Sequence, residues 1–169
     1  MRSRALILLA STIPAALAES AAGIHWTAPP AWKAQPQRPM RAATYAVPAA
    51  GGDTEDGECA VFFFGPGQGG GVEENIKRWT GQFQLVEKSP TTKNSSIAGF
   101  AVTTIDMAGT YLASSGPMMA TKAAKPGFRL LGAIVEAPQG NVFFKFTGPA
   151  RTVASHEAAF QAVLKTIHK

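Results

Sequence analysis

The sequence contains little of what most metal-binding and catalytic sites are made of. It has a single cysteine, Cys59, so it can form no disulfide within itself and has no cysteine cluster for zinc. Its three histidines, His25, His156 and His168, are far apart, and none has a second ligand three or four positions away. We therefore expect no metal and no cofactor. Cys59 lies in the apolar run ECAVFFF and is predicted to be a buried small side chain.

Charged residues are also scarce, at 16% of the chain, and they are not clustered by sign. The formal net charge is +5, but it falls to +3 if Arg2 and Arg4 are removed with a leader peptide. Only Lys122 and Lys125 lie loosely together among the remaining basic residues. No basic stripe with interleaved aromatic residues is present, so we expect no nucleic-acid partner.

The chain has no apolar run long enough for a membrane span, since a spanning helix needs about 20 residues. Its first 18 residues instead combine two arginines, an apolar run at 5–10 and the small-x-small sequence Ala16-Leu17-Ala18. These features are typical of a secretory signal peptide. An uncleaved anchor is the alternative, but Ser11, Thr12 and Pro14 interrupt the run. We predict cleavage of residues 1–18, which leaves residues 19–169 as a single exported domain, periplasmic or secreted, with no membrane span.

Hydrophobic periodicity predicts three strands, a helix, four strands and a second helix. The expected strands are 24–27, 40–48, 58–64, two within 97–113 joined near Asp106–Gly109, 128–138 and 141–149. The expected helices are 72–83 and 151–167, and the expected loops or turns are 51–57, 89–96 and 114–126. Short turns favour an antiparallel sheet, and the strand ECAVFFF is apolar on both faces. The sequence thus predicts an α+β domain, with an antiparallel sheet sandwiched by two amphipathic helices.

A glycine-dense loop joins the third strand to the first helix and formally matches the dinucleotide fingerprint G-x-G-x-x-G. Gly65, Gly67 and Gly70 supply the three glycines, and Glu87 stands near the position expected for a ribose-binding acid. However, Glu73 and Glu74 place negative charge where the pyrophosphate would bind. Alternating strand–helix units for a parallel sheet are also missing, and an exported protein would rarely meet the cofactor.

Two interpretations of the loop remain. Glycine allows a tight connection between strand and helix, so the loop can be a purely structural corner. Alternatively, its side-chain-poor backbone contacts a partner. The residues of this candidate contact are Gly65, Pro66, Gly67, Gln68, Gly69, Gly70 and Gly71.

Other candidate sites are weak. The acidic run 53–58 partly resembles a calcium loop, but its ligand spacing breaks and the distal glutamate is missing, so a solvated turn is favoured. Met118 and Met119, with His25, could suggest copper ligands, but the spacing fits no recognised methionine motif. Ser114-Ser115-Gly116 lacks the Gly-x-Ser-x-Gly elbow of hydrolases. No catalytic residue is predicted.

Three segments together resemble the PsbP-like fold, which is shared by photosystem II extrinsic subunits, Ran-binding Mog and many exported bacterial proteins. They are IHWTAPPAW at 24–32, VEENIKRWTGQF at 72–83, and the final hairpin and helix from LLGAIVE at 130 to KTI at 167. The run FFFGPGQGGGVEENIKRW with LLGAIVE is also similar to exported bacterial proteins of unassigned function. The resemblance implies a binding or assembly factor more than an enzyme, and it supplies no functional residues.

These observations favour an exported, non-catalytic domain that binds another envelope protein or helps to assemble an envelope complex. The alternative is a carrier of a small ligand or metal that uses a cleft beside the glycine loop or the 114–126 loop. A third hypothesis is a hydrolase in which His25 or His156 meets a serine or a carboxylate.

Overall fold

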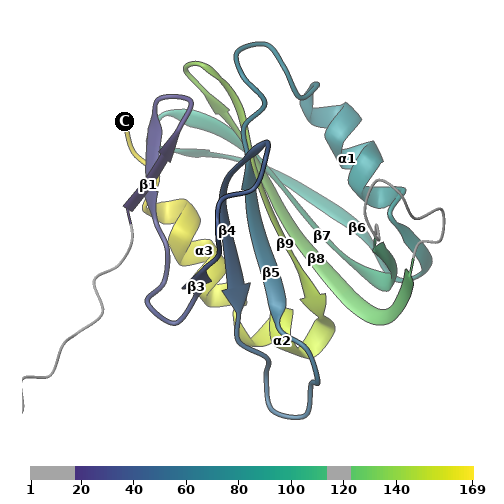
Figure 1. The fold of residues 1–169 in the computed structure, drawn as a ribbon. Helices are drawn as coiled ribbons and strands as arrows, with labels where there is room; N and C mark the ends of the chain where they lie inside the picture. Colours follow the sequence, from purple (N-terminus) through teal and green to yellow (C-terminus); the bar gives the residue numbers. More distant parts are fainter. Residues whose placement is uncertain (1–17, 114–122) are drawn as a thin grey trace, which may run out of the picture.

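The computed structural model describes residues 18–113 and 123–169, and its centre is one large antiparallel sheet (Figure 1). Seven strands follow the order β3-β4-β5-β9-β8-β7-β6. Their bounds are β3 Lys33–Ala34, β4 Arg41–Val47, β5 Gly57–Phe62, β6 Phe83–Ile97, β7 Phe100–Ala113, β8 Ala123–Ala137 and β9 Gly140–Pro149. Every neighbouring pair is antiparallel, which confirms the predicted α+β class with an antiparallel sheet.

A separate hairpin precedes the sheet and consists of β1 (Ala18–Ala21) and β2 (Ile24–Thr27). Its two turn residues, Ala22 and Gly23, both have positive φ, as a tight two-residue hairpin requires. The indole nitrogen of Trp26 donates a buried hydrogen bond to the Tyr45 hydroxyl at 3.0 Å. The N-terminal segment is therefore anchored to the sheet through Trp26.

Three helices occur in the described part of the chain, where the sequence predicts two. They are α1 (Val72–Thr80), α2 (Ala150–Ser155) and α3 (Glu157–Lys165). The expected final helix is divided at His156, whose φ of −108° and ψ of 8° are not helical. Helix α1 ends three residues earlier than expected, because Gly81 and Gln82 turn the chain into β6. No helix among these residues is long and apolar enough to cross a membrane.

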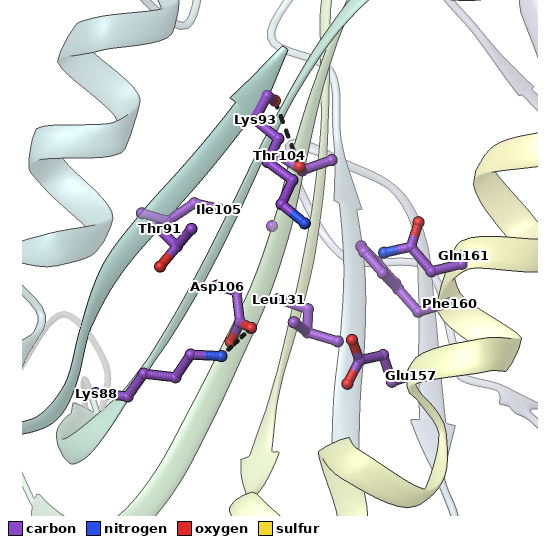
Figure 2. Close-up of a pocket in the computed structure, with 11 residues that line it drawn as sticks. Lys88, Thr91, Lys93, Thr104, Ile105, Asp106, Leu131, Glu157, Phe160 and Gln161 are labelled. Carbon is purple, nitrogen blue, oxygen red and sulfur yellow. Dashed lines mark hydrogen bonds and ion pairs between the residues drawn. The ribbon is translucent and has the colours of Figure 1, made fainter. Parts of the chain in front are cut away.

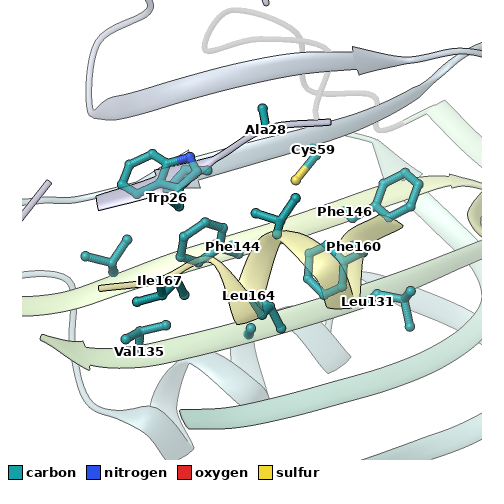
Figure 3. Packing of buried hydrophobic residues seen from close by; sticks show 14 of the residues in the cluster. Trp26, Ala28, Cys59, Leu131, Val135, Phe144, Phe146, Phe160, Leu164 and Ile167 are labelled. Carbon is teal, nitrogen blue, oxygen red and sulfur yellow. The ribbon is translucent and has the colours of Figure 1, made fainter. Parts of the chain in front are cut away.

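One face of the sheet holds the larger core cluster, which includes side chains of the β1–β2 hairpin, α2 and α3 (Figure 3). Leu131, Val135 and Phe144 contribute from the central strands, and Phe160 and Leu164 from α3. Cys59 belongs to this core and is fully buried, as predicted, and burial raises the pKa of its thiol. This cluster holds the end of the chain onto the sheet.

The opposite face carries a second cluster under α1. Because side chains alternate along a strand, Leu130 and Ile134 point to this face while their neighbours point to the first. Trp79 of α1 lies directly over Gly132, where an added Cβ would stand only 2.4 Å from the indole ring. Gly132 thus permits α1 to approach the sheet closely.

Two predictions about the middle of the chain are wrong. Residues 89–96 form part of the edge strand β6 and not a loop, and residues 100–113 form one strand without a break near Asp106–Gly109. The real turn lies at Ala98 and Gly99, which have φ of 51° and 85°. Residues 89–96 are polar on both sides because both sides are exposed, so hydrophobic alternation could not reveal the strand. Of the predicted loop 114–126, residues 123–126 belong to β8 and residues 114–122 lie outside the described part.

We expect Gly132→Ala to destabilise the protein by about 1–3 kcal/mol, because the new methyl group overlaps the Trp79 ring and pushes α1 outward. Urea denaturation followed by circular dichroism measures the change. The matched control is Gly51→Ala, where an added Cβ meets nothing within 4 Å. Equal unfolding midpoints for the two variants would contradict the packing argument.

Candidate functional site

The glycine loop has a backbone shape that only glycine adopts easily. Gly65, Gly67, Gly69 and Gly70 have φ of 102°, 68°, 88° and 81°. These values lie in the left-handed region, where a side chain clashes with its own backbone. The density of glycine in the sequence therefore has a structural cause at this corner.

Side chains from the neighbouring elements hold the loop in place. The Asn75 side-chain amide donates to the carbonyl oxygens of Gly69 at 2.8 Å and Gly71 at 2.9 Å. The amide of Asn141, just after the β8–β9 turn, donates to Gly70 O at 3.3 Å. The loop is thus bonded to both α1 and β9. The tip residues Pro66, Gly67 and Gln68 remain exposed.

The loop does not have the surroundings of a dinucleotide site. An added Cβ on Gly70 would lie 2.5 Å from a carboxylate oxygen of Glu74, so a negative charge already stands against the backbone. The strand before the loop, β5, pairs with antiparallel neighbours on both sides, so no parallel βαβ unit is present here. The geometry agrees with the sequence argument against a phosphate cradle.

An amphipathic groove of 660 Å³ opens beside the start of α1. Val72 and Ile76 give it an apolar wall on the helix, and mostly polar residues of β6, β7 and β8 give it the other wall. Its lining residues are Val72, Glu73, Ile76, Lys77, Thr92, Asn94, Ala101, Val102, Thr103 and Glu136. Because Val72 directly follows Gly71, the groove and the glycine loop are continuous along the chain.

On the opposite face, a charged cleft of 190 Å³ lies between α3 and strands β6 and β7 (Figure 2). Lys88, Asp106 and Glu157 line it, and Lys88 pairs with Asp106. Arg129 lies next to the cleft and donates two hydrogen bonds to Asp106, both at 2.9 Å. It also donates to Glu157 at 2.8 Å, which ties the start of α3 to β7 and β8.

These ion pairs stabilise the structure and engage both oxygens of the Asp106 carboxylate. Burial alone would raise the pKa of Asp106, but hydrogen bonds and charges from Arg129 and Lys88 outweigh burial and hold the pKa below its usual value. A general base that works efficiently at neutral pH has a pKa near 7, and the pKa of the Asp106 carboxyl lies well below that value. The ion pairs of Arg129 with Asp106 and Glu157 therefore hold α3 against the sheet, and we call these three residues the clamp.

The histidines predicted as candidates are not joined to catalytic partners. His25 stacks on His168 with ring centroids 5.4 Å apart, and Nε2 of His156 lies 3.0 Å from the carbonyl of Pro48. In the described part of the chain, no histidine side chain bonds to a serine or a carboxylate, and no three metal-ligating residues cluster. Met118 and Met119 lie outside that part.

The acidic run 53–58 performs structural tasks. The carboxylate of Asp53 accepts hydrogen bonds from the backbone nitrogen and the hydroxyl of Thr152, at 2.9 and 2.6 Å. Asp56 accepts a hydrogen bond from the backbone nitrogen of Ala49. This turn therefore fastens the β4–β5 connection to α2, in keeping with the structural interpretation of the sequence.

The sequence predictions do not include the ion pair of Asp106 and Arg129, nor the pocket lysine Lys145. Asp106 and Arg129 meet because β7 and β8 pair in a particular register, which the sequence does not show. Lys145 is different, since a lysine between Phe144 and Phe146 in a buried strand is itself a signal. That lysine lines a pocket on the side of α1 away from the large groove.

Comparison with solved structures defines the class of this antiparallel α+β domain. It resembles PsbP (CyanoP) from Synechocystis sp. PCC 6803, with a TM-score of 0.53, 11% identity, and coverage of 96% of this chain and 98% of that one. It also resembles PA94, a Pseudomonas aeruginosa protein of unknown function, with a TM-score of 0.52, 14% identity, and coverage of 84% and 88%. No protein-family model and no curated protein matches the sequence. The chain has a PsbP-like fold.

We expect Asp106→Asn to lower the free energy of unfolding by about 1–3 kcal/mol at pH 7, because Arg129 loses its bidentate partner. The pKa of Asp106 is lower folded than unfolded, so its stabilisation is present above about pH 3.9 and is lost as the pH falls through the folded value. Urea titrations at pH 7 and at about pH 2.5 should show the gap between variant and wild type closing.

The control is Asp56→Asn, which keeps an oxygen to accept the Ala49 hydrogen bond. The stabilising role of the clamp would be contradicted if Asp106→Asn lowered the free energy of unfolding at pH 7 no more than this control does. It would also be contradicted if the difference between Asp106→Asn and wild type persisted in acid.

Proposed function

We propose that this chain is an exported, non-catalytic accessory domain that binds another protein of the cell envelope. The PsbP-like fold supports an accessory or binding role. PA94, another similar structure, is described as a candidate regulator, which is also compatible with such a role. The observation that carries the proposal is the glycine loop, whose exposed tip is held in a fixed shape beside an amphipathic groove.

The proposed contact uses the two features together. Residues 65–71 carry almost no side chains, so a partner can approach their backbone closely. The groove then offers Val72 and Ile76 to apolar side chains of the partner, with Glu73 and Lys77 on the same helix for polar contacts. An extended segment of a partner protein fits this combination of exposed backbone and narrow apolar wall.

Export is the second part of the proposal. The leader at 1–18 has the charge, apolar run and cleavage sequence of a signal peptide. Cleavage after Ala18 would leave Glu19, Ser20 and Ala21 paired with β2, so almost the whole of the first hairpin would stay with the domain.

Expression of the full chain in a bacterial host with a general secretion pathway should yield a periplasmic protein that begins at Glu19. Intact-mass measurement and N-terminal sequencing check the cleavage site. Ala18→Arg should block cleavage, because signal peptidase needs a small residue there. A soluble cytoplasmic product that retains residues 1–18 would contradict export.

Docking can be tested with a photo-cross-linker attached to a cysteine at position 68. Gln68→Cys can be labelled selectively because the natural Cys59 is fully buried. In an envelope fraction from the native host, we expect one discrete adduct, identified by mass spectrometry. Adding Gly67→Asn should reduce this adduct several-fold, because asparagine tolerates the backbone shape but places a side chain at the contact.

The matched control is Gly127→Asn, since Gly127 has the same φ of 68° and an equally open Cβ position at the other end of the sheet. It should leave the adduct unchanged. The docking proposal fails if Gln68→Cys gives no adduct, or if a linker at Gln161→Cys on α3 captures the same protein equally well.

A further inference from the structure

A small aromatic pocket lies beneath α1, on the side away from the amphipathic groove. Its volume is 170 Å³, and four aromatic rings line it: Phe62, Phe64, Trp79 and Phe143. Phe62 and Phe64 stack with centroids 5.9 Å apart, and the Trp79 ring stands edge-on to Phe143 at 6.5 Å. An apolar cavity of about 150 Å³ is large enough to hold benzene, so this pocket suits a molecule with a single ring.

The pocket also contains an ammonium group whose charge has no close counter-charge. In the described residues, Lys145 forms no ion pair with a carboxylate. Its nitrogen donates instead to the side-chain oxygen of Gln82 and to the Tyr111 hydroxyl at 3.3 Å, and it lies 5.3 Å from the centre of the Tyr111 ring. Lys145 is half-buried, and holding a partly desolvated cation against only neutral partners is costly. A structural lysine would be expected to have an acidic partner.

The other charged groups around the pocket are already paired, which leaves the Lys145 ammonium to pair with a bound anion. Glu58 is an acidic group whose charge acts on Lys145, but it is already paired with Arg41 at 2.9 Å and Arg38 at 3.5 Å. Arg78 adds a second cation to the pocket lining; one of its nitrogens pairs with Glu74, and another donates to Asn75. Burial lowers the pKa of Lys145 to about 8, with Glu58 opposing and Arg41 reinforcing this shift. The group is therefore mostly protonated at pH 7.

We infer that this pocket binds a small single-ring aromatic carboxylate, with the ring against the aromatic walls and the carboxylate paired with Lys145. Aromatic walls with a few well-placed polar groups are typical of small-molecule sites, and a partly desolvated ammonium pairs strongly with a carboxylate. The site uses a different surface from the proposed protein contact and stands or falls independently of it.

Benzoate is the probe, and benzamide is its neutral counterpart of nearly the same shape. Isothermal titration calorimetry at pH 7 should show benzoate binding the wild type at least about tenfold more tightly than benzamide. The indole N–H signal of Trp79 should shift in NMR spectra on benzoate addition, while those of Trp26 and Trp32, in the other core, should not.

Lys145→Met removes the charge at similar volume and should weaken benzoate binding at least about tenfold while leaving benzamide unaffected. The matched control is Lys125→Met, since Lys125 also lies over an aromatic ring, Phe128 at 5.2 Å, but is paired with Glu55. Benzoate affinity of the wild type should fall several-fold between pH 7 and about pH 9.5, as Lys145 loses its proton. The Lys145→Met variant retains the other ionisable groups around the pocket, which are Glu58, Arg41, Arg78 and Tyr111. Any pH dependence of benzoate affinity that comes from those groups would therefore remain in that variant.

The wild-type comparison needs no variant to fold, so it decides the proposal alone. If about 10 mM benzoate produces neither binding heat nor a shift of the Trp79 signal, the proposal is overturned. The dissociation constant would then lie above that concentration, which is too weak for a specific binding site. Equal affinities for benzoate and benzamide would also overturn it, as would unchanged benzoate binding by a folded Lys145→Met protein.

Discussion

The close packing of Trp79 on Gly132 is the contact on which the arrangement around α1 depends. A side chain at position 132 would lift the helix, and with it the N-terminal turn to which the glycine loop is bonded through Asn75. The same contact sets the width of the spaces on either side of α1. One is the amphipathic groove toward β6 and β7, and the other is the aromatic pocket over β5 and β9. A single glycine in a buried strand thus positions the loop and both cavities.

The two faces of the sheet have different roles in this arrangement. On the face of α2 and α3, the large apolar core and the clamp of Asp106, Arg129 and Glu157 hold the end of the chain in place. The charges in that clamp neutralise one another, so they stabilise the fold and offer little to a ligand. On the face of α1, the loop tip is exposed and Lys145 has no acidic partner in the described residues. The ion pairs that fix the end of the chain therefore lie on one face, and both proposed binding features lie on the other.

The sequence predicts those parts of the fold whose side chains alternate or repeat. The β8–β9 hairpin follows from the short turn Pro138-Gln139-Gly140 between two apolar runs, and α1 follows from the apolar stripe of Val72, Ile76 and Trp79 at helical spacing. The sequence does not reveal this part of the edge strand β6, because exposure on both sides removes any hydrophobic signal from residues 89–96. For the binding region, the glycine loop is visible in the sequence, but its neighbours are not. Asn141 reaches Gly70, and Lys145 lines a pocket together with residues of α1, only because the loop and the helix pack on the sheet, which is a tertiary property.

The central claim is that binding occurs around α1 and its glycine loop and not at the α3 clamp. Amide hydrogen exchange, measured with and without a solubilised envelope fraction from the native host, tests it most directly. We predict slower exchange at residues 65–77 in the presence of the fraction, with exchange in α3 unchanged. Protection confined to residues 88–93 and 157–165, with the glycine loop unaffected, would contradict the claim.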